Sequence, residues 1–205
     1  WWNWLPGVEN RGEGIFFTLN EEKLRAFDND PNVLKRFSPI KTSFQQWTQE
    51  REWEIEEEFL PRYVLMHTLA HLLIRELATS SGYNSASIRE RIYHSDSTNG
   101  ILLFTASASS DGSLGGLVRQ GSPENFSRLL KKAINSARRC SRDPLCMEDD
   151  PAAKLEANTQ PITRINGSAC YACDLLPETS CENSNRLLDR QFVTNEVFGF
   201  FKDMK

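Results

Sequence analysis

The cysteines constrain the fold of this chain more than any other feature of its sequence. All five lie in the last third of the 205 residues, and Cys170 and Cys173 form a C-x-x-C pair. Such a pair can hold one metal ion from a single tight turn. Cys140 and Cys146 form a second short pair upstream. We therefore predict a four-thiolate metal site formed by Cys140, Cys146, Cys170 and Cys173, with Cys181 as the reserve ligand.

Zinc is the metal that we expect at this site. The sequence carries no other sign of redox chemistry, which disfavours an iron–sulfur cluster. Four thiolates fill a tetrahedral shell and leave no position for a zinc-bound water, so the ion would be structural. In small zinc peptides such an ion contributes on the order of 10 kcal/mol to folding. The alternative interpretation is that the cysteines are buried thiols or a disulfide set.

The composition is that of a soluble globular protein, with 39% hydrophobic and 25% charged residues. An odd number of cysteines grouped as metal ligands fits a reducing compartment, so we expect a cytoplasmic protein. The longest apolar run, residues 64–74, contains two histidines and is too short to span a bilayer. We expect no membrane contact. The chain starts at Trp1 without a basic leader, which indicates a piece of a longer chain and not a signal peptide.

The order of predicted elements indicates a mixed α+β fold within the α/β class, with helices packed on a small central sheet. Strands are predicted over residues 14–19 and 100–106, the second as the central strand. Helices are predicted over residues 20–27, 43–59, 62–79, 87–93, 122–140 and 183–201. We divide the chain into a strand–helix lead-in over residues 1–60, packed on the rest, and a zinc-binding domain over residues 61–205.

The helix predicted over residues 122–140 separates apolar side chains from basic ones. Its apolar side consists of Phe126, Leu129, Leu130, Ala133, Ile134 and Ala137. The basic residues, one of them just upstream of the helix, are Arg119, Arg128, Lys131, Lys132, Arg138 and Arg139. Because the whole chain has a net charge of −4, nucleic-acid affinity would have to come from such a local surface. We predict weak contacts of these side chains to DNA phosphates, and a merely solvated face is the alternative.

Two other groups of polar residues raise the question of catalysis. His67 and His71 share one face of the helix predicted over residues 62–79, as in zinc proteases, but Thr68 stands where that motif needs a glutamate base. We interpret the histidines as packing groups or as groups that support a metal ligand from behind. Asp111 precedes a glycine pair that matches no phosphate-binding fingerprint and is typical of a tight turn. We expect no enzyme, and a hydrolase or nuclease using His67, His71 or Asp111 is the alternative.

A series of short motifs, taken in order along the chain, resembles a known family. The motifs occupy residues 12–16, 67–71, 87–91, 100–104, 111–116, 143–146, 169–173 and 177–182. Together they resemble the C-terminal region of the helicase-associated B subunit of the DISARM anti-phage system. That region is similar to the zinc-binding domain that ends Mrf-type DNA repair helicases. The resemblance covers nearly the whole chain, although the spacing of the first cysteine pair differs from the Mrf-type pattern.

The resemblance implies a function and a set of partners. Residues 61–205 would be a helicase-associated zinc-binding domain, with Cys140, Cys146, Cys170 and Cys173 as its ligands. The module would be non-catalytic and would work with a superfamily 2 helicase on DNA during phage restriction or DNA repair. A second possibility is a structural protein-interaction domain without DNA contact, which would use the acidic residues 50–58 and the aromatic C-terminus.

Overall fold

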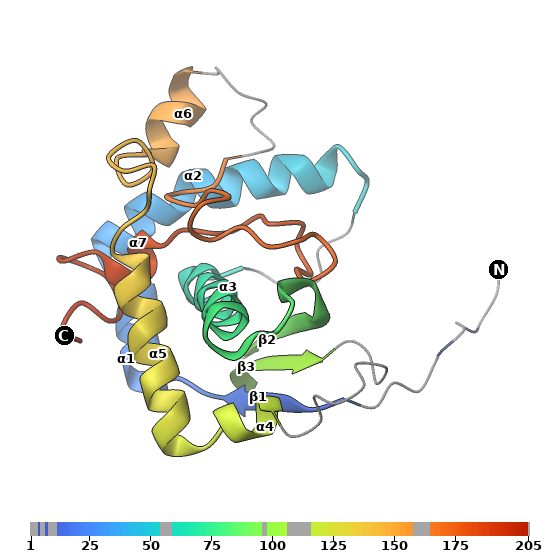
Figure 1. Cartoon of the computed structure of the whole chain (residues 1–205). Helices are drawn as coiled ribbons and strands as arrows, with labels where there is room; N and C mark the ends of the chain where they lie inside the picture. Colours follow the sequence, from blue (N-terminus) through green and yellow to red (C-terminus); the bar gives the residue numbers. More distant parts are fainter. Residues whose placement is uncertain are drawn as a thin grey trace.

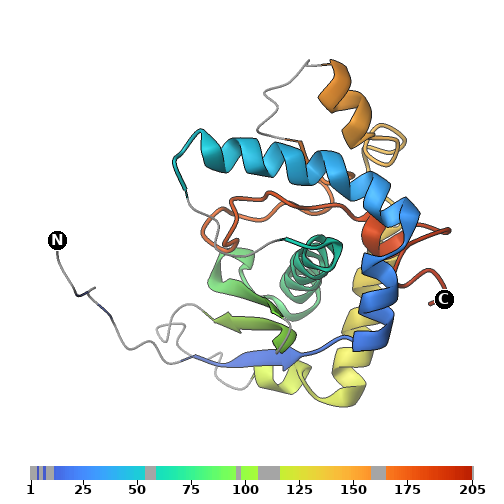
Figure 2. The ribbon, with the colours of Figure 1, turned by 180° about the vertical axis from the view of Figure 1, so that it is seen from behind.

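The computed structural model of the chain describes Trp4, Gly7 and residues 12–53, 59–95, 98–105, 116–157 and 165–204. Helix α3 (Pro61–Ser81) lies at its centre, with the sheet on one side, α2 on the opposite side and α5 alongside (Figures 1 and 2). Pro61 begins α3 and Gly82 ends it in the left-handed conformation, at a φ of 73° that favours glycine. Side chains on all faces of α3 are buried, so the helix predicted over residues 62–79 forms the centre of the core.

The sheet has three antiparallel strands in the order β1 (Gly14–Phe17), β3 (Thr98–Thr105) and β2 (Ile88–Ser95). Phe16 pairs with Leu102, and Ile101 pairs with Ile92. The strand predicted over residues 100–106 is therefore the central one, as expected. Together with the helices around it, this sheet confirms the mixed α+β fold.

Strand β2 corrects the helix predicted over residues 87–93. Ile88, Glu90 and Ile92 point inward, whereas the residues between them point outward, which is the alternation of a strand. Ser87 and Glu90 have the spacing of a helix capping box, and this local signal was misleading. In the structure, Asn84 instead caps the short 3-10 helix η1 (Ser85–Ser87), and pairing with β3 fixes the strand.

Two helices, α1 (Glu21–Asp28) and α2 (Pro31–Gln49), connect β1 to the core. The Asn20 side chain caps α1, which confirms the helix predicted over residues 20–27. The helix predicted over residues 43–59 was wrong at both ends. It begins earlier, because Asp30 caps α2 and Pro31 occupies its first turn, and it ends at Gln49, since residues 50–53 are not helical. The aspartate–proline pair therefore starts a helix. Of the predicted acidic segment, residues 54–58 lie outside the described part of the chain.

After the sheet the chain forms α4 (Gly116–Gln120), α5 (Pro123–Ala137) and α6 (Pro151–Ala157). Helix α5 packs on α3 and buries Leu129, Ala133, Ile134 and Ala137. This confirms the apolar side of the helix predicted over residues 122–140, although the helix ends three residues earlier.

The helix predicted over residues 183–201 was wrong. Only α7 (Gln191–Thr194) is helical there, because Ser184, Asn185 and Leu187 have positive φ angles that interrupt a helix. Most of the apolar side chains nevertheless pack on the core, and Phe192 is fully buried, whereas Val197 is exposed. We call residues 165–190 the C-terminal segment; its orange trace passes between α2 and α3 in both views (Figures 1 and 2).

Buried side chains from the predicted lead-in, residues 1–60, and from the predicted domain, residues 61–205, share one hydrophobic core. Leu24, Phe27 and Val33 belong to the same cluster as Leu69 and Phe192. The boundary at residue 60 stays a prediction. Among the described residues, no helix combines the length and the hydropathy that crossing a bilayer requires.

Candidate metal centre

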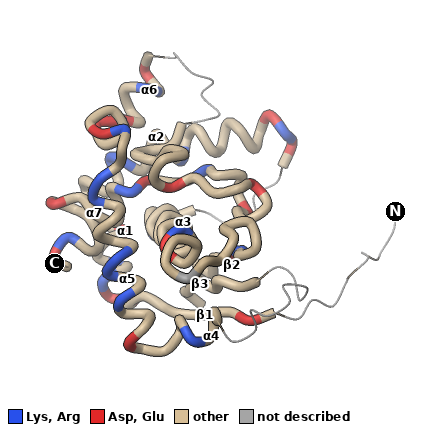
Figure 3. Tube along the Cα trace, in the orientation of Figure 1, with Lys and Arg blue, Asp and Glu red and all other residues tan. Residues whose placement is uncertain are grey.

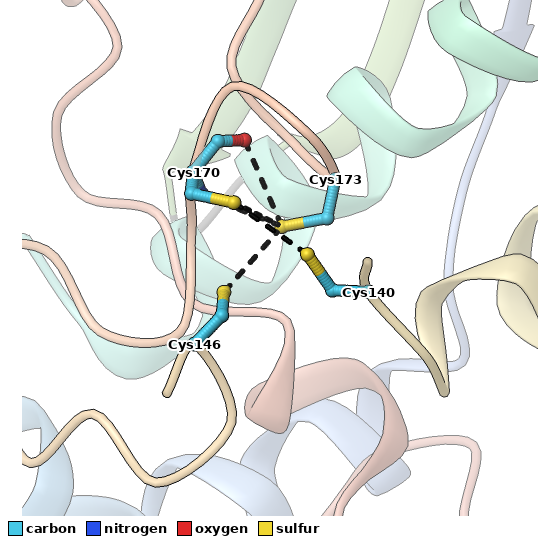
Figure 4. A group of neighbouring side chains, drawn as sticks. All are labelled: Cys140, Cys146, Cys170 and Cys173. Carbon is cyan, nitrogen blue, oxygen red and sulfur yellow. Dashed lines mark hydrogen bonds between the residues drawn. The ribbon is translucent and has the colours of Figure 1, made fainter. Parts of the chain in front are cut away.

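Four cysteine side chains from two separate turns point toward one another (Figure 4). Cys140 and Cys146 lie in the turn that follows α5, and Cys170 and Cys173 lie in a tight turn of the C-terminal segment. The Sγ–Sγ distances are 3.6 Å for Cys140–Cys170, 3.8 Å for Cys146–Cys173 and 3.7 Å for Cys170–Cys173. Zinc with Zn–S bonds of about 2.3 Å holds tetrahedral sulfurs about 3.8 Å apart. The cluster therefore has the size and the donor atoms that a zinc ion requires.

Backbone hydrogen bonds shape both turns around the sulfurs. The amides of Cys173 and Asp174 donate to the Cys170 carbonyl at 3.1 and 2.9 Å, which closes the C-x-x-C turn. The Cys170 amide donates to Cys173 Sγ at 3.3 Å, and the Arg142 amide donates to Cys140 Sγ at 3.4 Å. Such N–H groups stabilise thiolates and orient them toward a metal.

The pKa values of the clustered thiols indicate which of them a metal ion must deprotonate. Burial raises the pKa of the Cys146 thiol to about 11, against the opposing effect of the Arg190 guanidinium, and burial also raises the pKa of Cys173. Burial opposes ionisation of Cys170 as well, but the Ala172 amide and the neighbouring thiols outweigh it, so the pKa of Cys170 is lowered. Without a cation, Cys146 and Cys173 keep their protons near neutral pH. A divalent metal ion displaces those protons and binds the thiolates.

Arg190 joins the metal turns to the rest of the structure. Its side chain is fully buried, Nη1 donates to the Ala137 carbonyl at 2.9 Å, and Nη2 pairs with the Asp143 carboxylate. Asp143 Oδ2 in turn accepts a hydrogen bond from the Cys140 amide at 2.7 Å. These bonds therefore link the C-terminal segment to the end of α5 and to the first cysteine turn. Sequence reasoning missed Arg190, because nothing local links it to the cysteines.

Cys181, the predicted reserve ligand, lies elsewhere. It belongs to a second group of buried side chains, with His67, His71 and Glu90. The sequence placed both histidines on one face of a helix, as the structure does, but Glu90 was missed because its segment was read as a helix. Asp111, the remaining candidate for catalysis, lies outside the described residues.

The structure places most of the predicted basic residues on an exposed surface along α4, α5 and the turn after α5 (Figure 3). We call this the basic face, and its exposed members are Arg119, Arg128, Lys131, Lys132 and Arg139. Arg138 differs from the others, because it is half-buried and Nη2 donates to the Met204 carbonyl at 2.7 Å. Lys132 Nζ lies 3.9 Å from Glu76 Oε1, which partly offsets its charge.

Two comparisons with known proteins bear on this site. The sequence model of the MrfA Zn-binding domain matches residues 69–174, which include all four clustered cysteines. The DISARM protein DrmB of Bacillus paralicheniformis is 40% identical over 196 residues, which cover 95% of this chain and 34% of that protein. The chain therefore spans about a third of the length of this relative. The matched domain binds zinc, and the four-cysteine cluster can hold the ion.

Proposed function

We propose, since the chain belongs to the family of MrfA zinc-binding domains, that it is a non-catalytic zinc module that contacts DNA phosphates beside a superfamily 2 helicase in a DISARM-type defence against phage. The observation that carries the DNA contact is the exposed basic face. It runs along α5 into the turn that holds Cys140, so a zinc ion bound at the four cysteines would fix the end of this surface.

The basic face is suited to phosphate contact because its support is independent of its charges. Leu129 and Ile134 anchor α5 to the core, while Arg128 and Lys132 lie one helical turn apart on the exposed side. Arg139 follows in the turn after α5 and is also exposed. Lysine and arginine side chains in such an array bind the DNA backbone without reading its sequence. Because the chain as a whole is acidic, we expect weak binding that rises when a helicase adds its own surface.

A non-catalytic role is supported by the arrangement of the polar side chains. Four thiolates around one zinc ion leave no open position for a water or a substrate. His67 and His71 are fully buried, so neither imidazole can reach a substrate at the surface. The role in defence rests on the 40% identity to a DISARM protein, and the helicase partnership on the family resemblance of the motifs.

A salt titration of single- and double-stranded DNA tests the DNA contact. We expect the Arg128→Glu/Lys131→Glu variant to bind more weakly than the wild-type chain, with unchanged stability. For duplex DNA, the slope of log affinity against log salt should fall by about 0.9 for each phosphate that the variant no longer binds. Arg138 is not a suitable target, because its bond to the Met204 carbonyl couples charge to structure.

The matched control is Lys23→Glu/Lys35→Glu, which reverses two exposed charges on α1 and α2. Its net charge equals that of the test variant, so general repulsion from DNA changes equally in both. If both variants and the wild-type chain share one affinity and one slope, the basic face does not bind DNA.

One observation favours a second function, the binding of a protein. Leu145 and Tyr171 are 74% and 82% exposed, and each lies in a turn that carries two of the clustered cysteines. Exposed large apolar side chains held in a rigid turn are typical of protein contacts. Loss of helicase co-purification in Leu145→Ser/Tyr171→Ser, with DNA binding intact, would assign these turns to a protein partner.

A further inference from the structure

The buried group formed by His67, His71, Glu90 and Cys181 has no part in the function proposed above. The histidines project from α3, Glu90 from β2 and Cys181 from the C-terminal segment. All four side chains are buried, and their possible ligand atoms lie within 4.8 Å of one another. The zinc-domain match over residues 69–174 includes neither His67 nor Cys181.

The hydrogen bonds of His71 show that the group needs a positive charge between His71 and Glu90. Nδ1 lies 2.8 Å from the Asp174 carbonyl oxygen, which can only accept, so Nδ1 carries a proton. In a neutral imidazole, Nε2 then offers a bare lone pair. That nitrogen lies 3.3 Å from Glu90 Oε1, which also has only lone pairs when ionised. Two acceptors at this distance require a cation or a further proton between them.

The same oxygen of Glu90 also lies against the second imidazole. Oε1 also lies 2.8 Å from His67 Nε2, and that nitrogen lies 3.2 Å from Cys181 Sγ. Within the described part of the chain, Glu90 Oε2 and His67 Nδ1 have no hydrogen-bond partner. A carboxylate buried in this way is costly unless a cation or a complete hydrogen-bond network compensates it.

We propose that His67, His71, Glu90 and Cys181 bind a second zinc ion. Imidazole nitrogen, carboxylate oxygen and thiolate sulfur are the three donor types that zinc takes in proteins. Two neutral imidazoles, one carboxylate and one thiolate also balance the charge of the dication. The bond from His71 Nδ1 to the Asp174 carbonyl fixes the ring so that Nε2 faces the ion, as is usual for a metal-bound histidine.

The distances between the donor atoms equal those of a tetrahedral zinc site or are somewhat shorter. Tetrahedral zinc with bonds of about 2.0 to 2.3 Å sets nitrogen, oxygen and sulfur donors about 3.3 to 3.6 Å apart. The contact between His71 Nε2 and Glu90 Oε1, at 3.3 Å, already has this spacing. The separations of His67 Nε2 from Glu90 Oε1 and from Cys181 Sγ are 2.8 and 3.2 Å, so the ligands would move outward by a few tenths of an ångström.

The second ion would be structural. Four protein ligands close its shell, and their complete burial excludes a substrate. It would tie the core helix and the sheet to one end of the C-terminal segment, while the four-cysteine cluster ties the other end to the turn after α5. Asp174 connects the two sites, because it follows Cys173 in the chain and its carbonyl holds His71.

Zinc stoichiometry tests the proposal. The 205-residue chain, saturated with Zn²⁺, freed of excess by gel filtration and analysed by elemental mass spectrometry, should carry about two zinc ions. Cys181→Ser and Glu90→Gln should each lower the content to about one, whereas Cys170→Ser should remove the other ion. The control is His94→Asn, which removes the remaining histidine of the sequence, outside the group, and should keep both ions.

Every outcome of this experiment decides the question. A wild-type chain that saturates at one zinc ion overturns the second site, and so does a second ion that survives in both Cys181→Ser and Glu90→Gln. If those variants do not fold, a Co²⁺ titration of the wild-type chain replaces them. Absorption from tetrahedral cobalt, with thiolate charge transfer that grows beyond the first equivalent, supports the site, and saturation at one equivalent overturns it.

Discussion

Arg36 on α2 and Asp189 in the C-terminal segment form a buried ion pair, with Arg36 Nε 2.5 Å from Asp189 Oδ2. The carboxylate is fully buried and also accepts hydrogen bonds from the amides of Ser168 and Gln191. The guanidinium donates further to the Asp149 carbonyl and to Ser168 Oγ, both at 3.0 Å. This pair fastens a segment of little regular structure to a long helix, close to the four-cysteine cluster.

We expect Arg36→Ala to lower the free energy of unfolding by about 3 to 5 kcal/mol, because it leaves the buried Asp189 carboxylate without its counter-ion. Chemical denaturation monitored by circular dichroism measures the change. Arg25→Ala is the control, since Arg25 is 72% exposed and pairs with Glu21 one helical turn away. That pair should contribute less than about 1 kcal/mol. Equal losses for the two variants would show that Asp189 does not depend on Arg36.

Gly167 provides a second test of the same region. A Cβ atom at this position would lie 2.0 Å from Asp189 Oδ2, so any side chain displaces the carboxylate from Arg36. We expect Gly167→Ala to destabilise the chain by about 1 to 3 kcal/mol, as overpacking does elsewhere. Gly7→Ala, where an added Cβ meets nothing within 4 Å, should leave the unfolding midpoint unchanged. An unfolding midpoint for Gly167→Ala equal to that of the wild-type chain would contradict the close approach.

The sequence predicted those parts of the candidate site that depend on local spacing. Cys170 and Cys173 lie in one turn, so their side chains must lie close together whatever surrounds them. The histidine pair on α3 and the two-sided pattern of α5 follow from the helical period in the same way. Cys140 and Cys146 were found because their short spacing marks a second turn.

Contacts between distant residues could not be predicted in this way. Arg36 and Asp189 are separated by 153 positions, and His67 and Cys181 by 114. Glu90 was missed for a different reason, because its local pattern favours a helix cap and only pairing with β3 turns its side chain inward. Leu187 lies in the helix predicted over residues 183–201, and its positive φ is a conformation that leucine rarely adopts, so no local signal predicted it.

Substitution of a zinc ligand should lower both the zinc content and the stability of the chain, with the largest loss of structure near the four-cysteine cluster. We expect Cys173→Ser to bind one zinc ion fewer than the wild-type chain and to lose several kcal/mol of stability, because metal binding contributes directly to folding. Hydrogen exchange should show that the amides of the turn after α5 and of the C-terminal segment lose more protection than those of β3. A Cys173→Ser chain that keeps both its zinc content and its exchange pattern would remove Cys173 from the ligand set.

The stability that zinc adds should depend on pH in one direction. Because burial raises the pKa of Cys146 to about 11 and also raises that of Cys173, the metal-free chain keeps these thiols protonated, and zinc must displace the protons. Bound zinc holds the same groups as thiolates, so its contribution is present at higher pH and is lost as the pH falls. Each displaced proton should lower the zinc affinity about tenfold per pH unit of acidification.

The measurement is a set of thermal unfolding curves between neutral and mildly acidic pH, for the zinc-loaded Cys181→Ser chain, which should keep only the ion at the four cysteines, and for the same chain stripped by a chelator. The difference between their unfolding midpoints should shrink as the pH falls, while a zinc indicator dye reports release of the ion. The stripped chain is the control for the other groups that titrate in this range, such as the Asp174 carboxyl, whose pKa burial raises to about 6. A difference that stays constant across this range would show that protons and zinc do not compete at Cys146 and Cys173.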